Sequence, residues 1–264
     1  MQVITSKDNE FVKHVKKLKD KKARDISGEF LVEGIKLVDE AIKENAKIKK
    51  IILCEETSTS TEMSKTLTYE IAKYDCIYVS KKVYESITDV INPQGIMAII
   101  EKENNENLIR YDEDIIVMLD DIQDPGNLGT ILRTVDSIGL KQIIVSSGTA
   151  DVYNPKVVRS TMGAIFRVNV IMCDDLISCI KECKKHKFKL MTTSLSGSEL
   201  IYDVDYNKKI IVIGNEANGV SEKIHEMSDE RVKIPMLGNT ESLNASVATG
   251  IVLYEYVRQK LFKK

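Results

Sequence analysis

The sequence supplies few of the side chains from which histidine-based or metal-based active sites are built. Its 264 residues include three histidines, a poor supply for a catalytic triad or a zinc centre. Its cysteines are odd in number and form no Cys-x-x-Cys pair, so we expect reduced thiols of a cytoplasmic protein. Cys179 and Cys183 lie one helical turn apart near His186, but no second ligand cluster completes such a site, and we expect no metal. The cysteines are at positions 54, 76, 173, 179 and 183.

The sequence also lacks membrane-targeting segments and the common nucleotide-binding motifs. No N-terminal segment has the pattern of a secretory signal, and no apolar run has the length of a membrane span, so we expect no membrane contact. The chain has neither Gly-x-Gly-x-x-Gly nor the phosphate-binding Gly-x4-Gly-Lys-Ser/Thr, which disfavours a dinucleotide or nucleoside triphosphate. The formal net charge is -2, so the chain as a whole is not an obvious binder of polyanions.

Positive charge is concentrated at the start of the chain. Residues 1–24 hold eight lysines and arginines against three acidic residues. Such a patch fits contact with RNA phosphates, although charge alone is equally typical of a solvated helix face. The basic residues are Lys7, Lys13, Lys16, Lys17, Lys19, Lys21, Lys22 and Arg24.

The pattern of apolar runs predicts two α/β domains. A polar segment, 102–114, separates apolar runs at 96–100 and 115–119, so we predict domains at 1–105 and 114–264 with a linker at 106–113. The first half alternates strand runs at 30–34, 49–54, 76–80 and 95–101 with helices near 34–45, 61–73 and 81–88. The second half has apolar strand runs at 115–122, 142–147, 167–173, 189–195, 209–215 and 231–237. Amphipathic helices between them, at 127–139, 155–165, 175–186, 220–228 and 242–261, predict a parallel sheet covered on both faces.

Two loops of the second half follow predicted strands, where parallel sheets bind ligands. In DDIQDPGNLGTILRT (120–134), Pro125 and Gly126 indicate a tight turn, Asn127 a helix cap, and Arg133 lies two turns into the helix. In IGNEANGVSE (213–222), Gly214 and Gly219 allow close backbone approach, and the Glu216 carboxylate suits a hydroxyl or an amine. Taken singly, each is also explained by an ordinary turn and cap.

A third loop, GNTESLNASVATGI (238–251), carries more polar groups than a cap requires. Ser242 is a suitable N-cap for the last helix, but it explains only one of six small polar residues. The surplus suits a ligand with its own donors and acceptors, such as an adenine ring. Together the three loops describe a pocket with one carboxylate and one guanidinium, for a nucleoside ligand and an anionic substrate.

At these loops the sequence resembles the SpoU-type (TrmH-like) RNA ribose 2'-O-methyltransferases of the SPOUT superfamily. DPGNLGTILRTVDSIG, IVIGNEANGVS and IPMLGNTESLNASVATGIVLYEY resemble the three family motifs in order, and NPKVVRSTMGAIFRV resembles the segment between the first two. The first half is similar to the family's substrate-binding domain, which has a fold like ribosomal protein L30e. The resemblance covers nearly the whole chain.

The resemblance implies a fold, a cofactor and partners. The second half would be a methyltransferase domain with a trefoil knot, which general connection rules would not suggest. The cofactor would be S-adenosylmethionine, and family members act as homodimers with the active site near the interface. By position, Gly214, Ile234 and Leu243 would contact the cofactor largely through backbone, with Thr193, Ser242 and Asn244 close by.

The resemblance also assigns catalytic residues. The essential arginine falls on Arg133, the first-motif asparagine on Asn127 and the second-motif glutamate on Glu216. The family's arginine is often described as a general base, but neutralising a guanidinium at pH 7 costs about 7 kcal/mol or more. We therefore expect Arg133 to hold an RNA phosphate and stabilise the developing alkoxide, with Asn127 and Glu216 positioning the ribose and Arg133. RNA phosphates would be contacted by Lys13, Lys16, Lys17, Lys21, Lys22 and Arg24.

Alternative functions remain at this point. A non-catalytic RNA-binding protein with the same fold would be expected to lack Arg133, Glu216 or the third-motif amides, and all are present. A nicotinamide-dependent oxidoreductase requires Gly-x-Gly-x-x-Gly, which the first loop does not contain. The Ser-Leu-Asn of the third motif and Arg133 favour ribose over base methylation. We expect large-subunit ribosomal RNA as substrate, with transfer RNA as the alternative.

Overall fold

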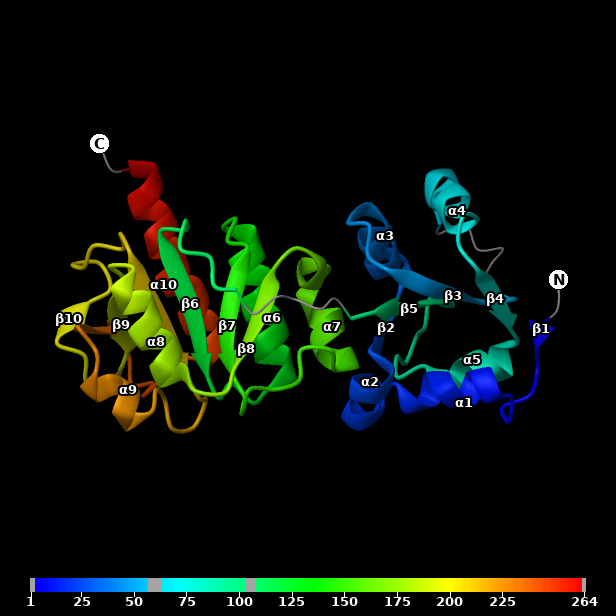
Figure 1. Ribbon diagram of the computed structural model, residues 1–264, viewed down its shortest axis with the longest axis horizontal. Helices are drawn as coiled ribbons and strands as arrows, with labels where there is room; N and C mark the ends of the chain where they lie inside the picture. The colour runs from blue at the N-terminus through cyan, green and yellow to red at the C-terminus, as the bar shows by residue number, and fades with distance from the viewer. Residues whose placement is uncertain (1–2, 57–62, 103–107, 263–264) are drawn as a thin grey trace. The chain divides into compact units, whose positions relative to one another are not determined.

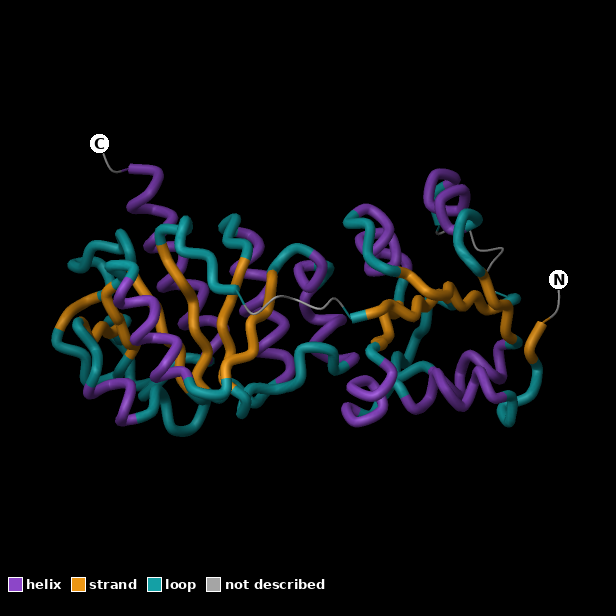
Figure 2. The backbone as a smooth tube through the Cα atoms, in the orientation of Figure 1, coloured by secondary structure: helices purple, strands orange, loops and turns teal. Residues whose placement is uncertain are grey.

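The computed structural model describes residues 3–56, 63–102 and 108–262. The chain divides into two compact units, one comprising residues 1–104 with 153–166 and the other 105–152 with 167–264. Each unit contains one sheet, drawn as arrows in Figure 1 and in orange in Figure 2. Residues 106 and 107 of the predicted linker, and 61 and 62 of a predicted helix, lie outside the described residues.

The first unit has a five-stranded sheet in the order β1-β4-β3-β5-β2. Neighbours β1, β4 and β3 run parallel, whereas β5 is antiparallel to β3 and to β2. The strands are β1 (Val3–Ile4), β2 (Glu29–Glu33), β3 (Ile48–Cys54), β4 (Cys76–Val79) and β5 (Ile96–Glu101). The helices are α1 (Glu10–Lys17), α2 (Lys21–Ser27), α3 (Ile35–Lys43), α4 (Lys65–Ile71) and α5 (Lys81–Ile87).

Side chains of this sheet alternate between two apolar cores. Met97 and Ile99 of β5 pack with α1 and α5, whereas Ile96, Ala98 and Ile100 pack with α3 and α4. Both faces of the sheet are therefore covered by helices, in an α/β arrangement that agrees with the alternating strand and helix runs.

The segment 153–166 departs from the predicted domain boundaries, since it packs with the first unit. It contains α7 (Pro155–Thr161) and the short 3-10 helix η1 (Ala164–Phe166). Val158 is buried in the core beneath α3, and the Tyr153 ring lies 4.7 Å from the Phe30 ring. The apolar side of this segment completes the first unit's core, a role that its position in the sequence does not reveal.

The second unit has a seven-stranded sheet in the order β10-β12-β9-β11-β6-β7-β8, and every neighbouring pair is parallel. The predicted parallel α/β sheet is confirmed, with the short β10 as an unpredicted edge strand. The strands are β6 (Ile115–Asp120), β7 (Gln142–Ser146), β8 (Asn169–Cys173), β9 (Lys189–Thr193), β10 (Glu199–Leu200), β11 (Lys209–Gly214) and β12 (Glu230–Lys233). The implied trefoil knot stays a prediction.

Helices cover both faces of this sheet. Ile180 of α8 (Leu176–Lys185) and Ile224 of α9 (Glu222–Glu226) pack in one core with Ile116, Met118 and Val212. The helices α6 (Pro125–Ser137) and α10 (Ala245–Phe262) contact each other and cover the opposite face (Figure 1). Strands buried on both faces explain the near-continuous apolar runs of this half.

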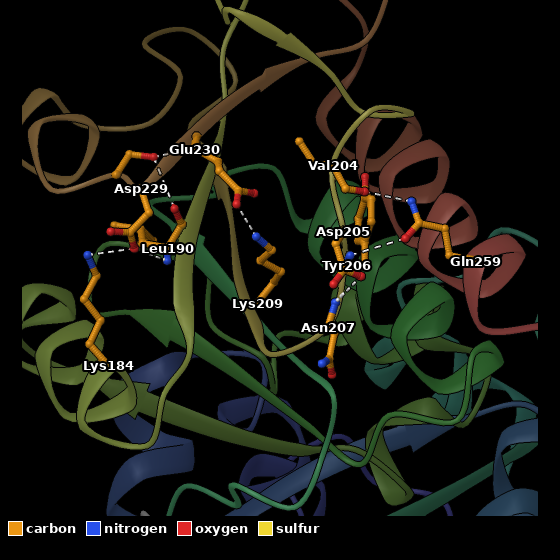
Figure 3. Close-up of polar contacts among 11 residues, drawn as sticks. Lys184, Leu190, Val204, Asp205, Tyr206, Asn207, Lys209, Asp229, Glu230 and Gln259 are labelled. Carbon is orange, nitrogen blue, oxygen red and sulfur yellow. Dashed lines mark hydrogen bonds and ion pairs between the residues drawn. The ribbon is translucent and has the colours of Figure 1, made fainter. Parts of the chain in front are cut away.

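Polar contacts connect the amino ends of three strands (Figure 3). Lys209 at the start of β11 is 3% exposed and forms an ion pair with Glu230 at the start of β12. Asp229 accepts a hydrogen bond from the Leu190 backbone N–H at 2.7 Å and pairs with Lys184 at 2.9 Å. These contacts set the register of β9, β11 and β12, and so the positions of their carboxyl ends.

Cys179, Cys183 and His186, which lie close together in the sequence, do not form a common metal site. Cys173 at the end of β8 and Cys179 in α8 form a disulfide, so the expectation of five reduced thiols is wrong for this pair. The chain reverses direction between β8 and α8, which brings the two sulfurs together. Cys183 is buried, and burial raises its pKa to about 12. The His186 ring instead stacks on the Tyr111 ring, with centroids 3.6 Å apart.

Candidate active site

A cavity of about 480 Å³ lies at the carboxyl ends of β9, β11 and β12. This is the edge at which parallel sheets bind ligands, and the volume suits a small molecule. Five predicted cofactor-binding residues line it: Thr193, Gly214, Ile234, Ser242 and Leu243. The lining therefore combines three strand ends with the loop that precedes α10, and it fits a ligand recognised largely by main-chain groups.

Gly214 ends β11, and its backbone packs directly against the turn that follows it. A Cβ atom at Gly214 would lie 2.0 Å from both the Gly219 carbonyl carbon and the Val220 nitrogen. Only glycine fits this spacing, because both obstructing atoms belong to the main chain. The wall of the cavity at this point is therefore formed by backbone.

Glu216 ties that turn to the loop between β6 and α6. Its carboxylate accepts hydrogen bonds from the backbone N–H groups of Gln123 at 3.2 Å and Asp124 at 3.1 Å, and from Asn127 Nδ2 at 2.9 Å. Burial alone would raise the pKa of Glu216, but these hydrogen bonds outweigh burial and hold the pKa below its ordinary value. Glu216 is therefore a carboxylate at neutral pH.

Asn127 connects Glu216 to the third loop. Its Oδ1 accepts a hydrogen bond from Asn244 Nδ2 at 2.9 Å, while its Nδ2 donates to Glu216. Asn127 is 8% exposed, so these two contacts satisfy both ends of a buried amide. The chain Glu216–Asn127–Asn244 thus links all three predicted loops beside the cavity.

The helix caps differ from those that the sequence suggested. Asp124 caps α6, since its Oδ1 accepts from the Asn127 N–H at 2.8 Å, and Asn127 lies in the first turn of the helix. Asn244 precedes α10, and its Oδ1 accepts from the Ser246 N–H at 3.0 Å, so Ser242 is not the cap. The Asp-Pro pair at 124–125 is a cap signature that the sequence did contain.

Arg133 lies away from this hydrogen-bonded chain. It is exposed on α6, roughly 9 Å further along the helix axis than Asn127 at a rise of about 1.5 Å per residue. Among the residues that the structure describes, no ion pair or hydrogen bond holds its guanidinium. Arg133 is therefore available to a group from outside this chain.

Five of the predicted RNA-contacting residues lie on the surface of α1 and α2, but the sixth does not. Arg24 is 1% exposed, and its guanidinium donates to the backbone oxygens of Leu18 at 2.8 Å and Lys19 at 2.7 Å. The prediction that Arg24 contacts RNA phosphates is therefore corrected, because Arg24 holds the corner between α1 and α2. The exposed or half-buried residues are Lys13, Lys16, Lys17, Lys21 and Lys22.

His225 of α9 also lines the cavity, although sequence reasoning placed no histidine near the site. Its Nδ1 lies 2.9 Å from Thr192 Oγ1. Little in the sequence indicates this position, since His225 is in a short helix nine residues after Glu216. In the described residues, no group of three or more histidine, cysteine, aspartate or glutamate side chains could hold a metal ion.

Comparison with known proteins identifies the family. Residues 114–254 match the SpoU rRNA methylase family, and residues 9–98 match the MRM3-like substrate binding domain. The chain belongs to the SpoU rRNA methylase family. Its similarity to SpoU-family members extends over both units. The 23S rRNA (guanosine(2553)-2'-O)-methyltransferase RlmP of Bacillus subtilis is 32% identical over 255 residues, which cover 96% of this chain and 98% of RlmP.

Solved structures of SpoU-family proteins have the same fold. The SpoU methyltransferase AviRb from Streptomyces viridochromogenes, in complex with the cofactor AdoMet, aligns with a TM-score of 0.85 at 27% identity, over 96% of this chain and 99% of AviRb. An AdoMet-bound rRNA methyltransferase from Sinorhizobium meliloti aligns with a TM-score of 0.86 at 31% identity, over 98% of each chain. No helix in the described part of this SpoU-family chain has the length and apolarity needed to cross a membrane.

Proposed function

We propose that this enzyme transfers the methyl group of S-adenosylmethionine to a ribose 2'-hydroxyl of large-subunit ribosomal RNA. The observation that carries the proposal is the chain Glu216–Asn127–Asn244, which joins three loops beside a cavity suited to a nucleoside ligand. Family membership and relatives that are named as 23S rRNA 2'-O-methyltransferases support the same reaction. Thr193, Gly214, Ile234, Ser242 and Leu243 would hold the cofactor, with Asn244 beside it.

Arg133, Glu216 and Asn127 have different roles in methyl transfer to the ribose. The cofactor's sulfonium supplies an electrophilic methyl group. The 2'-hydroxyl oxygen would take up that methyl group as its bond to sulfur breaks, and the cofactor would leave as the thioether. The hydroxyl proton would pass to water or to a neighbouring RNA phosphate oxygen. Arg133 holds an RNA phosphate and stabilises the developing negative charge, because a guanidinium has only donors to offer. Glu216 and Asn127 keep the loops in place and position the ribose.

Transfer RNA is the second candidate substrate. Its support is narrower, since two relatives that match nearly the whole chain are named for a specific position in 23S rRNA. Purified protein, labelled S-adenosylmethionine and total RNA from a strain that lacks this gene test both candidates. We expect label as a 2'-O-methylnucleoside in 23S rRNA. Label in transfer RNA, or on a base, would overturn the assignment of substrate or of the methylated atom.

The division of labour between the halves is part of the proposal. Residues 1–105 would bind the RNA substrate with an L30e-like fold, and 106–113 would act as linker. Residues 114–264, apart from the segment 153–166 that packs with the first unit, would bind the cofactor and carry out transfer. The match of residues 9–98 to a substrate-binding domain supports the first role. A cytoplasmic location follows from a ribosomal RNA substrate.

The lysines of α1 and α2 should carry salt-dependent RNA affinity. Replacing Lys16, Lys17 and Lys21 with glutamine should lower the slope of log affinity against log salt by roughly two to three, about one per lost phosphate contact. Filter binding to 23S rRNA fragments at several salt concentrations measures this slope. The matched control replaces Lys36, Lys43 and Lys65 with glutamine. These lysines belong to helices on the opposite face of the same sheet, and replacing them changes the net charge by the same amount. Equal loss from both triple variants would contradict a specific RNA face.

The functional state should be a homodimer with the active site near its interface. Val247 and Tyr254 of α10 are 50% and 54% exposed. Tyr254 Oη lies 3.5 Å from the Oγ of Ser137, which follows Arg133 by four residues in α6. Such exposed apolar side chains beside a catalytic residue suit a partner copy. Sedimentation equilibrium should give about twice the chain mass of 29.8 kDa. A monomeric mass in an active preparation would contradict the dimer.

A further inference from the structure

His225 lies on the wall of the cofactor cavity, and none of the roles above uses it. A buried hydroxyl chain runs behind its ring. Thr192, which is fully buried, lies 2.9 Å from His225 Nδ1 and 3.0 Å from Ser228 Oγ. Ser228 in turn donates to the Glu230 backbone oxygen at 2.6 Å.

The directions of these hydrogen bonds fix the histidine tautomer. A hydroxyl has one proton, and Ser228 gives its proton to a backbone carbonyl, so Ser228 Oγ accepts the proton of Thr192. The longer alternative, Ser228 to Leu190 O at 3.4 Å, uses the same proton. Thr192 Oγ1 can then only accept from His225, so Nδ1 carries the hydrogen. In the neutral ring, Nε2 is therefore an acceptor.

His225 lines the cavity on the side of β11 opposite to the loop that Glu216 contacts. Glu216 bonds to the β6–α6 loop, whereas His225 bonds to β9, and β11 separates β6 from β9 in the sheet. Val220 and Val232, both nearly fully buried, line the cavity with His225. Among the described residues, Nε2 has no hydrogen-bond partner, while Nδ1 has Thr192.

We propose that His225 Nε2 accepts a hydrogen bond from the exocyclic amino group of the cofactor's adenine ring. The proposal rests on the cofactor cavity assigned above. Apolar walls suit a flat heteroaromatic ring, whereas the cofactor's ammonium group would lose hydration there without a charged partner. His225 would thus distinguish adenine from purines that have a carbonyl at the same position, since a carbonyl cannot donate.

This contact makes cofactor affinity depend on pH. Desolvation lowers the pKa of His225 from its usual 6.5, Arg231 of β12 lowers it further, and Glu222 of α9 and Asp120 of β6 raise it. Glu216 and Glu241 also line the cavity. Protonation places a hydrogen on Nε2 and a positive charge near a cationic ligand. Affinity for S-adenosylmethionine should therefore be complete above pH 6.5 and fall as the pH drops through the His225 pKa.

Two conservative substitutions of His225 distinguish the acceptor role of Nε2 from the hydrogen bond between Nδ1 and Thr192. His225→Asn keeps a donor for Thr192 at the position of Nδ1 but cannot reach the adenine, whereas His225→Gln places an amide oxygen near the position of Nε2. Titration calorimetry with the full chain should show about five- to tenfold weaker S-adenosylmethionine binding for His225→Asn at pH 7.5, the worth of one hydrogen bond. His225→Gln should bind within about twofold of wild type and lose the fall in affinity that wild type shows below pH 6.5.

Two further experiments test which part of the cofactor contacts His225 and which tautomer the ring adopts. Methylthioadenosine, which lacks the amino acid, should show the same loss with His225→Asn; a loss confined to S-adenosylmethionine would assign Nε2 to the ammonium and overturn the proposal. Nitrogen NMR of the wild-type imidazoles should show the Nδ1–H tautomer for His225, and the Nε2–H tautomer would overturn it without any variant. If wild type binds S-adenosylmethionine but Gly214→Val binds it equally well, the cavity assignment itself fails.

Discussion

Replacing Arg133 with alanine should lower the turnover number for methyl transfer by about 10²–10³-fold, the size typical for one lost donor to a developing oxyanion. Affinity for S-adenosylmethionine should change less than twofold, because Arg133 is exposed on α6 and lies outside the cavity lining. The free energy of unfolding should change by no more than about 0.5 kcal/mol, since the side chain makes no described polar contact. Single-turnover transfer to 23S rRNA and calorimetric binding measure the two effects separately.

Arg133→Lys is the matched control for this result. It keeps the charge but loses the planar pair of donors, so it should recover only part of the rate. Equal rates for lysine and wild type would reduce the role of Arg133 to charge alone. A turnover number for Arg133→Ala within about threefold of wild type would remove Arg133 from the reaction.

Gly214→Val should abolish measurable cofactor binding, a weakening of at least about 100-fold. Its Cβ would occupy space 2.0 Å from main-chain atoms of Gly219 and Val220, so the turn that forms the cavity wall must move. Moving that turn also displaces Glu216, and overpacking of this kind typically costs about 1–3 kcal/mol of stability. Equilibrium dialysis with labelled S-adenosylmethionine and urea unfolding would record both changes.

Gly238→Ala supplies the control within the same site. Gly238 belongs to the third loop, and a Cβ there meets no atom within 4 Å. This variant should bind the cofactor within about twofold of wild type. If both glycine variants bind normally, the main-chain wall is not part of the cofactor site.

The sequence predicted the second unit better than the first, for physical reasons. Strands such as β6 and β11 are buried on both faces, so continuous apolar runs at 115–119 and 210–213 identify them without tertiary information. The edge strand β10 and the packing of 153–166 depend on contacts with distant segments, and a local pattern does not encode such contacts. Arg24 was misassigned because charge in a sequence does not show that carbonyl oxygens surround the guanidinium.

The candidate site was likewise predicted only in part from the sequence. The family resemblance singled out Glu216, Asn127 and Asn244, but it did not show that the Asn127 amide bridges the other two. Placement of Ser242 as a cap failed because Asn244, two residues later, caps the helix more directly. His225 was missed because only the sheet order brings α9 to the same cavity as Glu216.

The packing of α7 and η1 with the first unit bears on how such proteins can be recombined. A fragment that ends at residue 105 lacks Val158, Ile165 and Phe166, which pack in its core. The complementary fragment would carry those apolar side chains without the sheet that covers them. The two halves are therefore not freely exchangeable modules, and a hybrid that takes residues 1–105 from a relative would need to take residues 153–166 from the same parent.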